Sequence, residues 1–378
     1  MRKKLLPLIL AAAFIATAQA AEPYIKKTEK EVVRDGKKYS LVDQSIFFEN
    51  GKIWYVTLSE NGKKELVKQK WDDYFLGLEF GRPKSSNGGW SIWGFLNIYS
   101  MAGGRAVSDL QLYRAEKIYI AKLKDCTVAE FVFPLSADDS AGKINLKAMQ
   151  FPAFADWMFF KVKFDSKTMT PWRMDLSAYP GNSNSSKERE RWIAVKDQNI
   201  NVTKDGAGFK PDSNGLAIFS KFQHENFGNL IVFDNSKYSR ISSPKGADGG
   251  VIIQFTPNTD ETEFTFALGY FSDKPAKDEA PKFLNEIQPK IFEFMGRINW
   301  EPKVDASEFN KLAEDTAKLI KDLGDNADAR KHQDSLDKIK ASFKQAEAIN
   351  NLPVSIDATN ELKKLQEQIS KAGLAQLQ

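Results

Sequence analysis

Alternation of apolar and other side chains along short segments is the feature that most restricts what this chain can fold into. Successive side chains of a β-strand point to opposite faces of a sheet, so alternation predicts a strand with one buried face. The segment WMFFKVKF at 157–164 places four apolar side chains on a single face: Met158, Phe160, Val162 and Phe164. The segment EFTFALGYF at 263–271 repeats the pattern with Phe264, Phe266, Leu268 and Tyr270. Both segments are predicted to be strands that pack one face on a core.

Tight turns separate the segments that have strand character. Asn50-Gly51 and Asn61-Gly62 interrupt the run FFENGKIWYVTLSENGKKELVKQ, and Asn-Gly supplies the positive φ that a two-residue hairpin turn needs. Further runs typical of strands are FLGLEF, EKIYIAKL, TVAEFVF, RWIAVK, GLAIFSKF, NLIVFD and GVIIQF. Roughly a dozen strands without amphipathic helices between them predict a large antiparallel β-sandwich rather than a parallel α/β sheet.

The composition changes near residue 300. Residues 38–272 are rich in Phe, Trp, Tyr, Gly and β-branched side chains, whereas residues 301–378 contain no Trp or Tyr and much Lys, Glu, Asp, Ala and Leu. A shift of this kind marks a boundary between structural units. We expect a mainly β chain with an antiparallel β-sandwich domain at 21–272, a helical linker at 273–300, and an α-helical hairpin or small bundle at 301–378.

Apolar residues recur at helical spacing in the C-terminal region. The first stripe is Phe309, Leu312, Ala313, Thr316, Leu319, Ile320 and Leu323, the second is Leu336, Ile339, Phe343, Ala346 and Ile349, and the third is Leu362, Leu365, Ile369 and Ala372. Each stripe lasts only about three turns, which favours packing among the helices or on the sandwich over a coiled-coil seam. A protein partner bound through these helices is the alternative. In the preceding run at 280–297, Pro289 predicts a kink or a break.

The N-terminus has the layout of a secretory signal. Arg2, Lys3 and Lys4 precede an apolar stretch, and Ala18-Gln19-Ala20 is a small-x-small cleavage sequence, so residues 1–20 are predicted to be removed. The apolar stretch is shorter than the about 20 residues that span a bilayer. We therefore expect a bacterial protein exported to the periplasm or the medium, with no transmembrane segment after cleavage.

Charge and motif content argue against several classes of function. The formal net charge is +4, and it falls to +1 without the three basic residues of the signal, so nucleic acid is not expected as a partner. Neither a phosphate-binding P-loop nor a G-x-G-x-x-G sequence is present, and two His residues in the chain leave little for a metal cluster. We expect no metal and no cofactor. Cys126, the only Cys, is interpreted as a small strand residue rather than a reactive thiol.

Aromatic residues are concentrated at 90–99, in WSIWGFLNIY. Positions of even number carry Trp90, Ile92, Gly94, Leu96 and Ile98, which suit a sandwich core. Positions of odd number combine rings with amides and hydroxyls: Ser91, Trp93, Phe95, Asn97 and Tyr99. Such a face either packs under another layer or binds a ligand, because rings stack on the apolar face of a sugar while Asn hydrogen-bonds its hydroxyls. The candidate ligand-binding residues are Trp93, Phe95, Asn97 and Tyr99.

Catalytic candidates are few. His224 follows a strand-like run and is adjacent to Glu225, which suits an acid/base site, and no G-x-S-x-G sequence accompanies it. Asp175 in PWRMDLSAYPG is a candidate carboxylate for glycoside chemistry, which needs two. An ion pair with Arg173 explains Asp175 equally well.

The segment FFENGKIWYVTLSENGKKELVKQKW resembles the first hairpins of the galactose-mutarotase-like β-supersandwich superfamily. PWRMDLSAYPG and LIVFD, followed by GVIIQFTPNTDETEFTFALGYF, are similar to segments of secreted sandwich proteins of environmental bacteria. The resemblance covers residues 40–272. It implies a protein that acts on carbohydrate, because that superfamily includes sugar epimerases, polysaccharide lyases and parts of glycosidases. Its epimerases use a His and a Glu on the concave sheet, and here His224 is the one candidate for the first. The hypotheses are an exported glycan-binding protein, a non-enzymatic envelope or assembly protein, and a carbohydrate-active enzyme.

Overall fold

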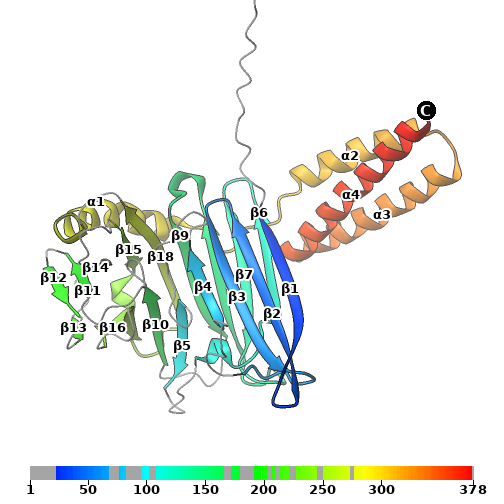
Figure 1. Cartoon of the computed structure of the whole chain (residues 1–378). Helices are drawn as coiled ribbons and strands as arrows, with labels where there is room; N and C mark the ends of the chain where they lie inside the picture. Colours follow the sequence, from blue (N-terminus) through cyan, green and yellow to red (C-terminus); the bar gives the residue numbers. More distant parts are fainter. Residues whose placement is uncertain are drawn as a thin grey trace, which may run out of the picture.

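The structure is a computed structural model that describes residues 23–67, 76–81, 95–101, 108–165, 172–178, 191–196, 198–202, 206–209, 213–220, 227–244, 250–272 and 276–376. Within these ranges the chain is a layered β-structure followed by four helices (Figure 1). The strands of the N-terminal half are β1 (Tyr24–Arg34), β2 (Lys37–Phe48), β3 (Gly51–Glu60), β4 (Gly77–Gly81), β5 (Leu96–Ser100), β6 (Lys117–Lys122), β7 (Thr127–Pro134), β8 (Lys143–Gln150) and β9 (Met158–Asp165).

The remaining strands are β10 (Trp172–Ala178), β11 (Arg191–Val195), β12 (Gln198–Asn201), β13 (Ala207–Phe209), β14 (Gly215–Ser220), β15 (Phe227–Phe233), β16 (Tyr238–Ser243), β17 (Val251–Pro257) and β18 (Glu263–Ser272). Three short 3₁₀ helices join them: η1 (Asp109–Gln111), η2 (Pro152–Phe154) and η3 (Asn235–Lys237). The helices are α1 (Ala276–Arg297), α2 (Ser307–Asp322), α3 (Ala327–Ala348) and α4 (Leu352–Gln376).

The described strands form three antiparallel sheets. Their orders are β1-β2-β3-β4, β13-β16-β17-β10-β5 and β12-β11-β14-β15-β18-β9-β8-β7-β6. One continuous apolar core contains side chains from all three sheets. Rings meet across it, as where Tyr55 of β3 packs edge-on against Phe133 of β7 and Phe233 of β15 against Phe255 of β17. The nine-stranded sheet is thus one layer, and the four- and five-stranded sheets together form the other. The predicted antiparallel β-sandwich with a helical C-terminal region is confirmed.

Local sequence explains the strand faces. The alternating sets predicted for 157–164 and 263–271 are all buried in the core, and each fully buried ring contributes on the order of 1.5–3 kcal/mol. Asn50-Gly51 turns β2 into β3, and Asn61-Gly62 turns the chain after β3, where Gly62 has φ of +83°. Strand β1 was not predicted, since its charged side chains are mostly exposed and give no apolar alternation.

Helix α1 lies on the outer face of the nine-stranded sheet, over β11, β14, β15 and β18 (Figure 1). It buries Ala280, Leu284, Ile291 and Met295 against that sheet. The helix does not split at Pro289, in contrast to one of the two outcomes expected there, and runs as one element. Packing on both sides of the proline compensates for the single backbone hydrogen bond that proline removes.

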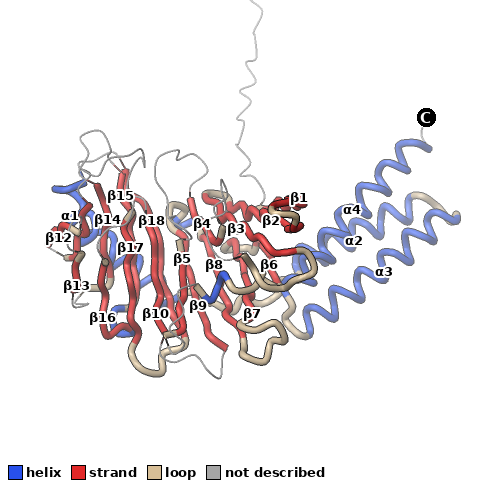
Figure 2. Tube along the Cα trace, turned by 60° about the horizontal axis from the view of Figure 1, so that its bottom comes forward, coloured by secondary structure: helices blue, strands red, loops and turns tan. Residues whose placement is uncertain are grey.

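Helices α2, α3 and α4 pack around a core of their own, in which Phe309 and Phe343 stack with ring centroids 3.8 Å apart. Figure 2 shows the three helices extending away from one end of the sandwich. They contact it where Leu352 of α4 packs with Tyr119 of β6 and Met149 of β8. Ile349, counted with the second stripe, is 68% exposed because it lies at the turn after α3. None of the described helices is long and apolar enough to cross a membrane.

Candidate functional site

Three strands far apart in sequence lie side by side in the five-stranded sheet, with β10 between β5 and β17 (Figure 2). Asp175 of β10 pairs with Asn97 of β5 on one side and with Gln254 of β17 on the other. Arg173 of β10 pairs with Tyr99 of β5. Directly paired residues point to the same side of a sheet, so their side chains share one surface. We call this surface the polar face and define it by Asn97, Tyr99, Arg173, Asp175 and Gln254.

The opposite side of the same strands is apolar and buried. Its residues are Leu96, Ile98, Met174, Leu176, Ile253 and Phe255, all within the core of the sandwich. The predicted core positions Leu96 and Ile98 are confirmed. Period-two geometry therefore fixes the orientation of the polar face, because a strand that buries one set of side chains must turn the alternate set away.

An ion pair lies at the centre of the polar face. Arg173 donates from Nε to Oδ1 of Asp175 at 2.8 Å and from Nη2 to Oδ2 at 3.1 Å. Gln254 donates from Nε2 to the same Oδ2 at 3.3 Å. The Asp175 side chain is 5% exposed and that of Arg173 is 28% exposed. This two-pronged contact is the ion pair that the sequence offered as one explanation of Asp175, and it holds the carboxylate in a single orientation.

The guanidinium of Arg173 also contacts the ring of Tyr99. Its Cζ lies 4.7 Å from the ring centroid, within the range of a cation–π interaction. Tyr99 is half-buried, so ring, guanidinium and carboxylate form a fixed row across two strands. Asn97 is 6% exposed and accepts a hydrogen bond at 3.2 Å from Nε2 of Gln111 in η1.

The segment that carries Gln111 is itself anchored to β5. Ser108 Oγ accepts from the backbone N–H of Ile98 at 3.0 Å, and Asp109 Oδ2 accepts from that of Ser100 at 2.6 Å. Two backbone N–H groups of β5 at this edge are therefore satisfied by side chains. This arrangement fixes the amide of Gln111 beside the polar face.

Burial changes the proton affinity of the polar face. It raises the pKa of the Asp175 carboxyl above its usual value, while the charge and hydrogen bonds of Arg173 and the bond from Gln254 act in the opposite direction. Burial also raises the pKa of Tyr99, and the Asp175 charge adds to that effect. Tyr99 thus remains a neutral phenol at ordinary pH, and Asp175 is a carboxyl that accepts a proton more readily than an exposed Asp.

Phe95 does not lie on the polar face, which corrects the expectation that it shares a face with Tyr99. It is fully buried and packs against Phe80 and Phe160. The strand begins one residue later, at Leu96. Phe95 instead joins two sheets: its N–H donates to the Leu78 carbonyl of β4 at 2.6 Å, and its carbonyl accepts from Ser177 of β10 at 2.8 Å.

The other candidates have different outcomes. Trp93, His224 and Glu225 lie outside the residues that the structure describes. The structure brings together Asn97 and Tyr99, named as ligand-binding candidates, and Asp175, named as a catalytic candidate. Gln254 and Gln111 were not predicted, because polar amides carry no signal until strand pairing places them. Within the described ranges, no three His, Cys, Asp or Glu side chains gather as they would around a metal ion.

No protein-family model matches this chain, and no curated protein sequence matches it. Solved structures do match. A galactose 1-epimerase from Lactobacillus acidophilus matches with a TM-score of 0.32 and 7% identity, over 67% of this chain and 100% of the epimerase.

Two longer enzymes also match. An alpha-N-acetylgalactosaminidase from Bifidobacterium bifidum has a TM-score of 0.41 and 7% identity, over 65% of this chain and 38% of that one. An alpha-galactosidase from Lactobacillus brevis has a TM-score of 0.33 and 10% identity, over 77% of this chain and 47% of that one. This chain therefore spans less than half of either enzyme. Such low scores and identities carry no information about its activity or ligand.

Proposed function

We propose that this protein binds carbohydrate at the polar face. The observation that carries the proposal is the register of β5, β10 and β17, which places an aromatic ring, a guanidinium–carboxylate pair and amides on one sheet surface. On that surface Tyr99, Arg173 and Gln254 are half-buried, and Asn97 and Asp175 are buried. Ligand sites combine apolar or aromatic surface with a few fixed polar groups. Here the polar groups are held by one another before any ligand arrives, so little ordering remains to be done on binding.

The chemistry of these groups suits neighbouring sugar hydroxyls, which each donate and accept. The half-buried amide of Gln254 does both, while the buried Asp175 holds Arg173 and Gln254 in place. Arg173 makes its described hydrogen bonds through Nε and Nη2, which leaves the two N–H groups of Nη1 to donate to a ligand. Tyr99 adds a partly exposed ring beside them. This surface can therefore contact both the polar edges and the apolar face of a saccharide.

The first test is a glycan-array screen of the full mature chain, followed by calorimetric titration with the best ligand. We expect Tyr99→Leu and Gln254→Ala each to weaken binding about tenfold, the loss typical of one good contact to a charged or buried partner. Tyr24→Leu is the matched control, because Tyr24 is 49% exposed on β1 and is not part of the polar face. If folded protein gives no binding signal on any glycan of the array, carbohydrate binding is refuted. Binding that neither variant weakens refutes this location.

Export completes the proposal and is supported by the N-terminal sequence alone. N-terminal sequencing of the protein from bacterial periplasm or medium is expected to read from Ala21. A cytoplasmic product that retains Met1 contradicts export.

A further inference from the structure

A pocket lies beside the four-stranded sheet, on elements other than those of the polar face. It has a volume of about 370 Å³ and is formed by the end of β3, the turn after it, the segment before β6 and the turn between β7 and β8. The residues that matter for its chemistry are Ser59, Lys64, Tyr113, Arg114, Glu116 and Asp139. Its volume falls within the range of small-molecule sites.

Arg114 enters this pocket as a cation bound only to neutral groups. Its Nε donates to Thr57 Oγ1 at 3.1 Å, and its Nη2 donates to Ser59 Oγ at 3.1 Å and to the Ser40 carbonyl at 3.5 Å. Thr57 and Ser59 are buried, so they hold the guanidinium plane in place. Among the described residues Arg114 makes no ion pair, and its Nη1 makes no hydrogen bond. A fixed, half-buried guanidinium with two spare donors is suited to an oxyanion.

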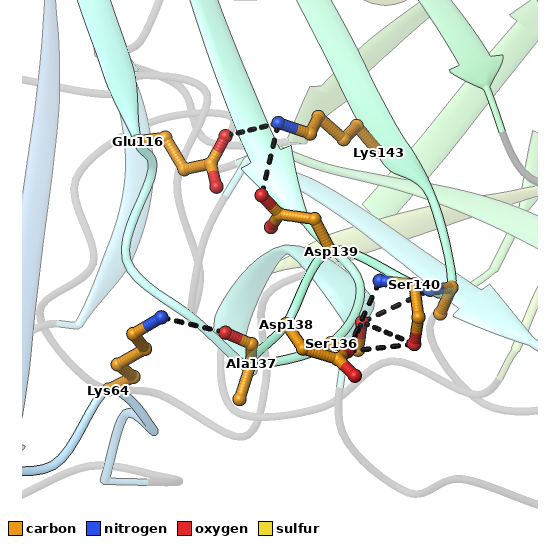
Figure 3. A network of polar contacts seen from close by, with 9 residues as sticks. Lys64, Glu116, Ser136, Ala137, Asp138, Asp139, Ser140 and Lys143 are labelled. Carbon is orange, nitrogen blue, oxygen red and sulfur yellow. Dashed lines mark hydrogen bonds and ion pairs between the residues drawn. The ribbon is translucent and has the colours of Figure 1, made fainter.

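The two carboxylates of the pocket share one cation. Lys143 contacts Glu116 at 2.7 Å and Asp139 at 3.4 Å, so one ammonium holds both acids (Figure 3). Lys64 lines the pocket and donates to the Ala137 carbonyl at 2.8 Å (Figure 3). It makes no ion pair to a described carboxylate. Arg114 and Lys64 are thus two cations of the same pocket that form no ion pair with a carboxylate in the described part of the chain.

Hydrogen bonds within the β7–β8 turn hold the wall that Lys64 contacts. In the β7–β8 turn, Asp138 Oδ1 accepts from Ser136 Oγ at 2.9 Å, from Ser140 Oγ at 2.7 Å and from the Ser140 N–H at 3.2 Å (Figure 3). These hydrogen bonds lower the pKa of Asp138 to about 2, so the network persists at all ordinary pH values. The pocket is therefore built before a ligand binds.

We propose that this pocket binds an oxyanion, that is, the carboxylate, sulfate or phosphate group of a small polar molecule, between Arg114 and Lys64. The anion accepts from Nη1 of Arg114 and from the Lys64 ammonium, and it supplies the negative charge that both cations lack. Ser59 and Tyr113 line the same pocket and offer hydroxyl groups to the rest of the ligand. The site is independent of the proposed sugar-binding face, and either can fail without the other.

The test is calorimetric titration of the full mature chain at low ionic strength with inorganic phosphate, sulfate, glucuronate and, as the neutral probe, glucose. Phosphate, sulfate or glucuronate is expected to bind, and the tightest of them identifies the type of anion. Lys64→Gln and Arg114→Gln are each expected to weaken that binding about tenfold or more, because a hydrogen bond to a charged group is lost. Added NaCl is expected to weaken it as well, by screening.

Lys318→Gln on α2 is the matched control, since Lys318 is 72% exposed and lies in the helical bundle. If Arg114→Gln disturbs folding, Lys64→Gln alone tests anion binding, because Lys64 is exposed and its one described hydrogen bond is to a carbonyl. Absence of binding by every anion overturns the proposal. So does binding that survives Lys64→Gln unchanged, or that Lys318→Gln weakens equally. Glucose binding that is sensitive to Tyr99→Leu but not to Lys64→Gln belongs to the polar face.

Discussion

Replacing Arg173 by Gln isolates the energetics of the buried carboxyl on the polar face. The variant Arg173→Gln removes two charge-assisted hydrogen bonds, at 2.8 and 3.1 Å, from a side chain that is 5% exposed. Each such bond contributes on the order of 1.5–3 kcal/mol, and a glutamine recovers about 1 kcal/mol through a neutral bond. Because Arg173 is partly exposed, we expect a loss in the free energy of unfolding of about 2–3 kcal/mol near pH ~7.

The loss is expected to depend on pH in one direction. The pKa of Asp175 is already raised by burial in the folded state, and removing the Arg173 charge raises it further. A group with a raised folded pKa stabilises the fold fully below its unfolded pKa, and that stability is lost as pH rises through the folded pKa. Near pH ~3.5 the carboxyl is largely protonated in both states, so Arg173→Gln is expected to cost only about 1 kcal/mol there.

Urea unfolding of wild type and variant at both pH values measures these differences. Adding Asp175→Asn to Arg173→Gln is expected to restore about 1–2 kcal/mol near pH ~7, because an amide leaves no buried charge. An equal loss at both pH values, or a double variant no more stable than Arg173→Gln alone, refutes the view that an uncompensated buried carboxylate is the cause.

Two further outcomes test the packing. Gly269→Ala is expected to lower the free energy of unfolding by about 1–3 kcal/mol in urea, because the new Cβ would lie 2.8 Å from the Trp157 ring. Gly296→Ala places its Cβ with no atom within 4 Å and is expected to stabilise α1 by about 0.5 kcal/mol. Equal effects of the two substitutions would contradict the close contact between Gly269 and Trp157. Burial, with a smaller effect of Asp125, raises the pKa of Cys126 to about 11, so its reaction with a disulfide reagent near pH ~8 is expected to be about a hundredfold slower in native than in urea-unfolded protein. Equal rates would show that the thiol is not shielded.

Much of the fold was predictable because strand periodicity is local. Phe160 and Phe266 are buried for the reason that their segments indicated: each lies on the apolar side of an alternating run. The same reasoning assigned the wrong orientation to Phe95. Its backbone hydrogen bonds to Leu78 and Ser177, in two different sheets, turn it into the core, and no local pattern encodes that junction.

The candidate site was predictable only in fragments. Asn97 and Tyr99 were named as ligand-binding residues and Asp175 as a catalytic carboxylate, and no local pattern joined the two hypotheses. Arg114 was not named at all, since the residues that hold it, Thr57 and Ser59, are 57 and 55 positions away in the chain. Whether a cation has an ion-pair partner can be judged only when the neighbours of its side chain in space are known.

The sequence by itself determined which stretches are strands or helices and which of their sides are apolar, because those properties depend on periods of two and 3.6 residues within a single segment. Tertiary structure decided which strands are neighbours. Hydrogen bonding between β5, β10 and β17 places Asn97, Asp175 and Gln254 in one row, although more than seventy positions separate each from the next. The register between strands decides which side chains become neighbours on a sheet surface, and that register depends on many contacts between residues distant in sequence.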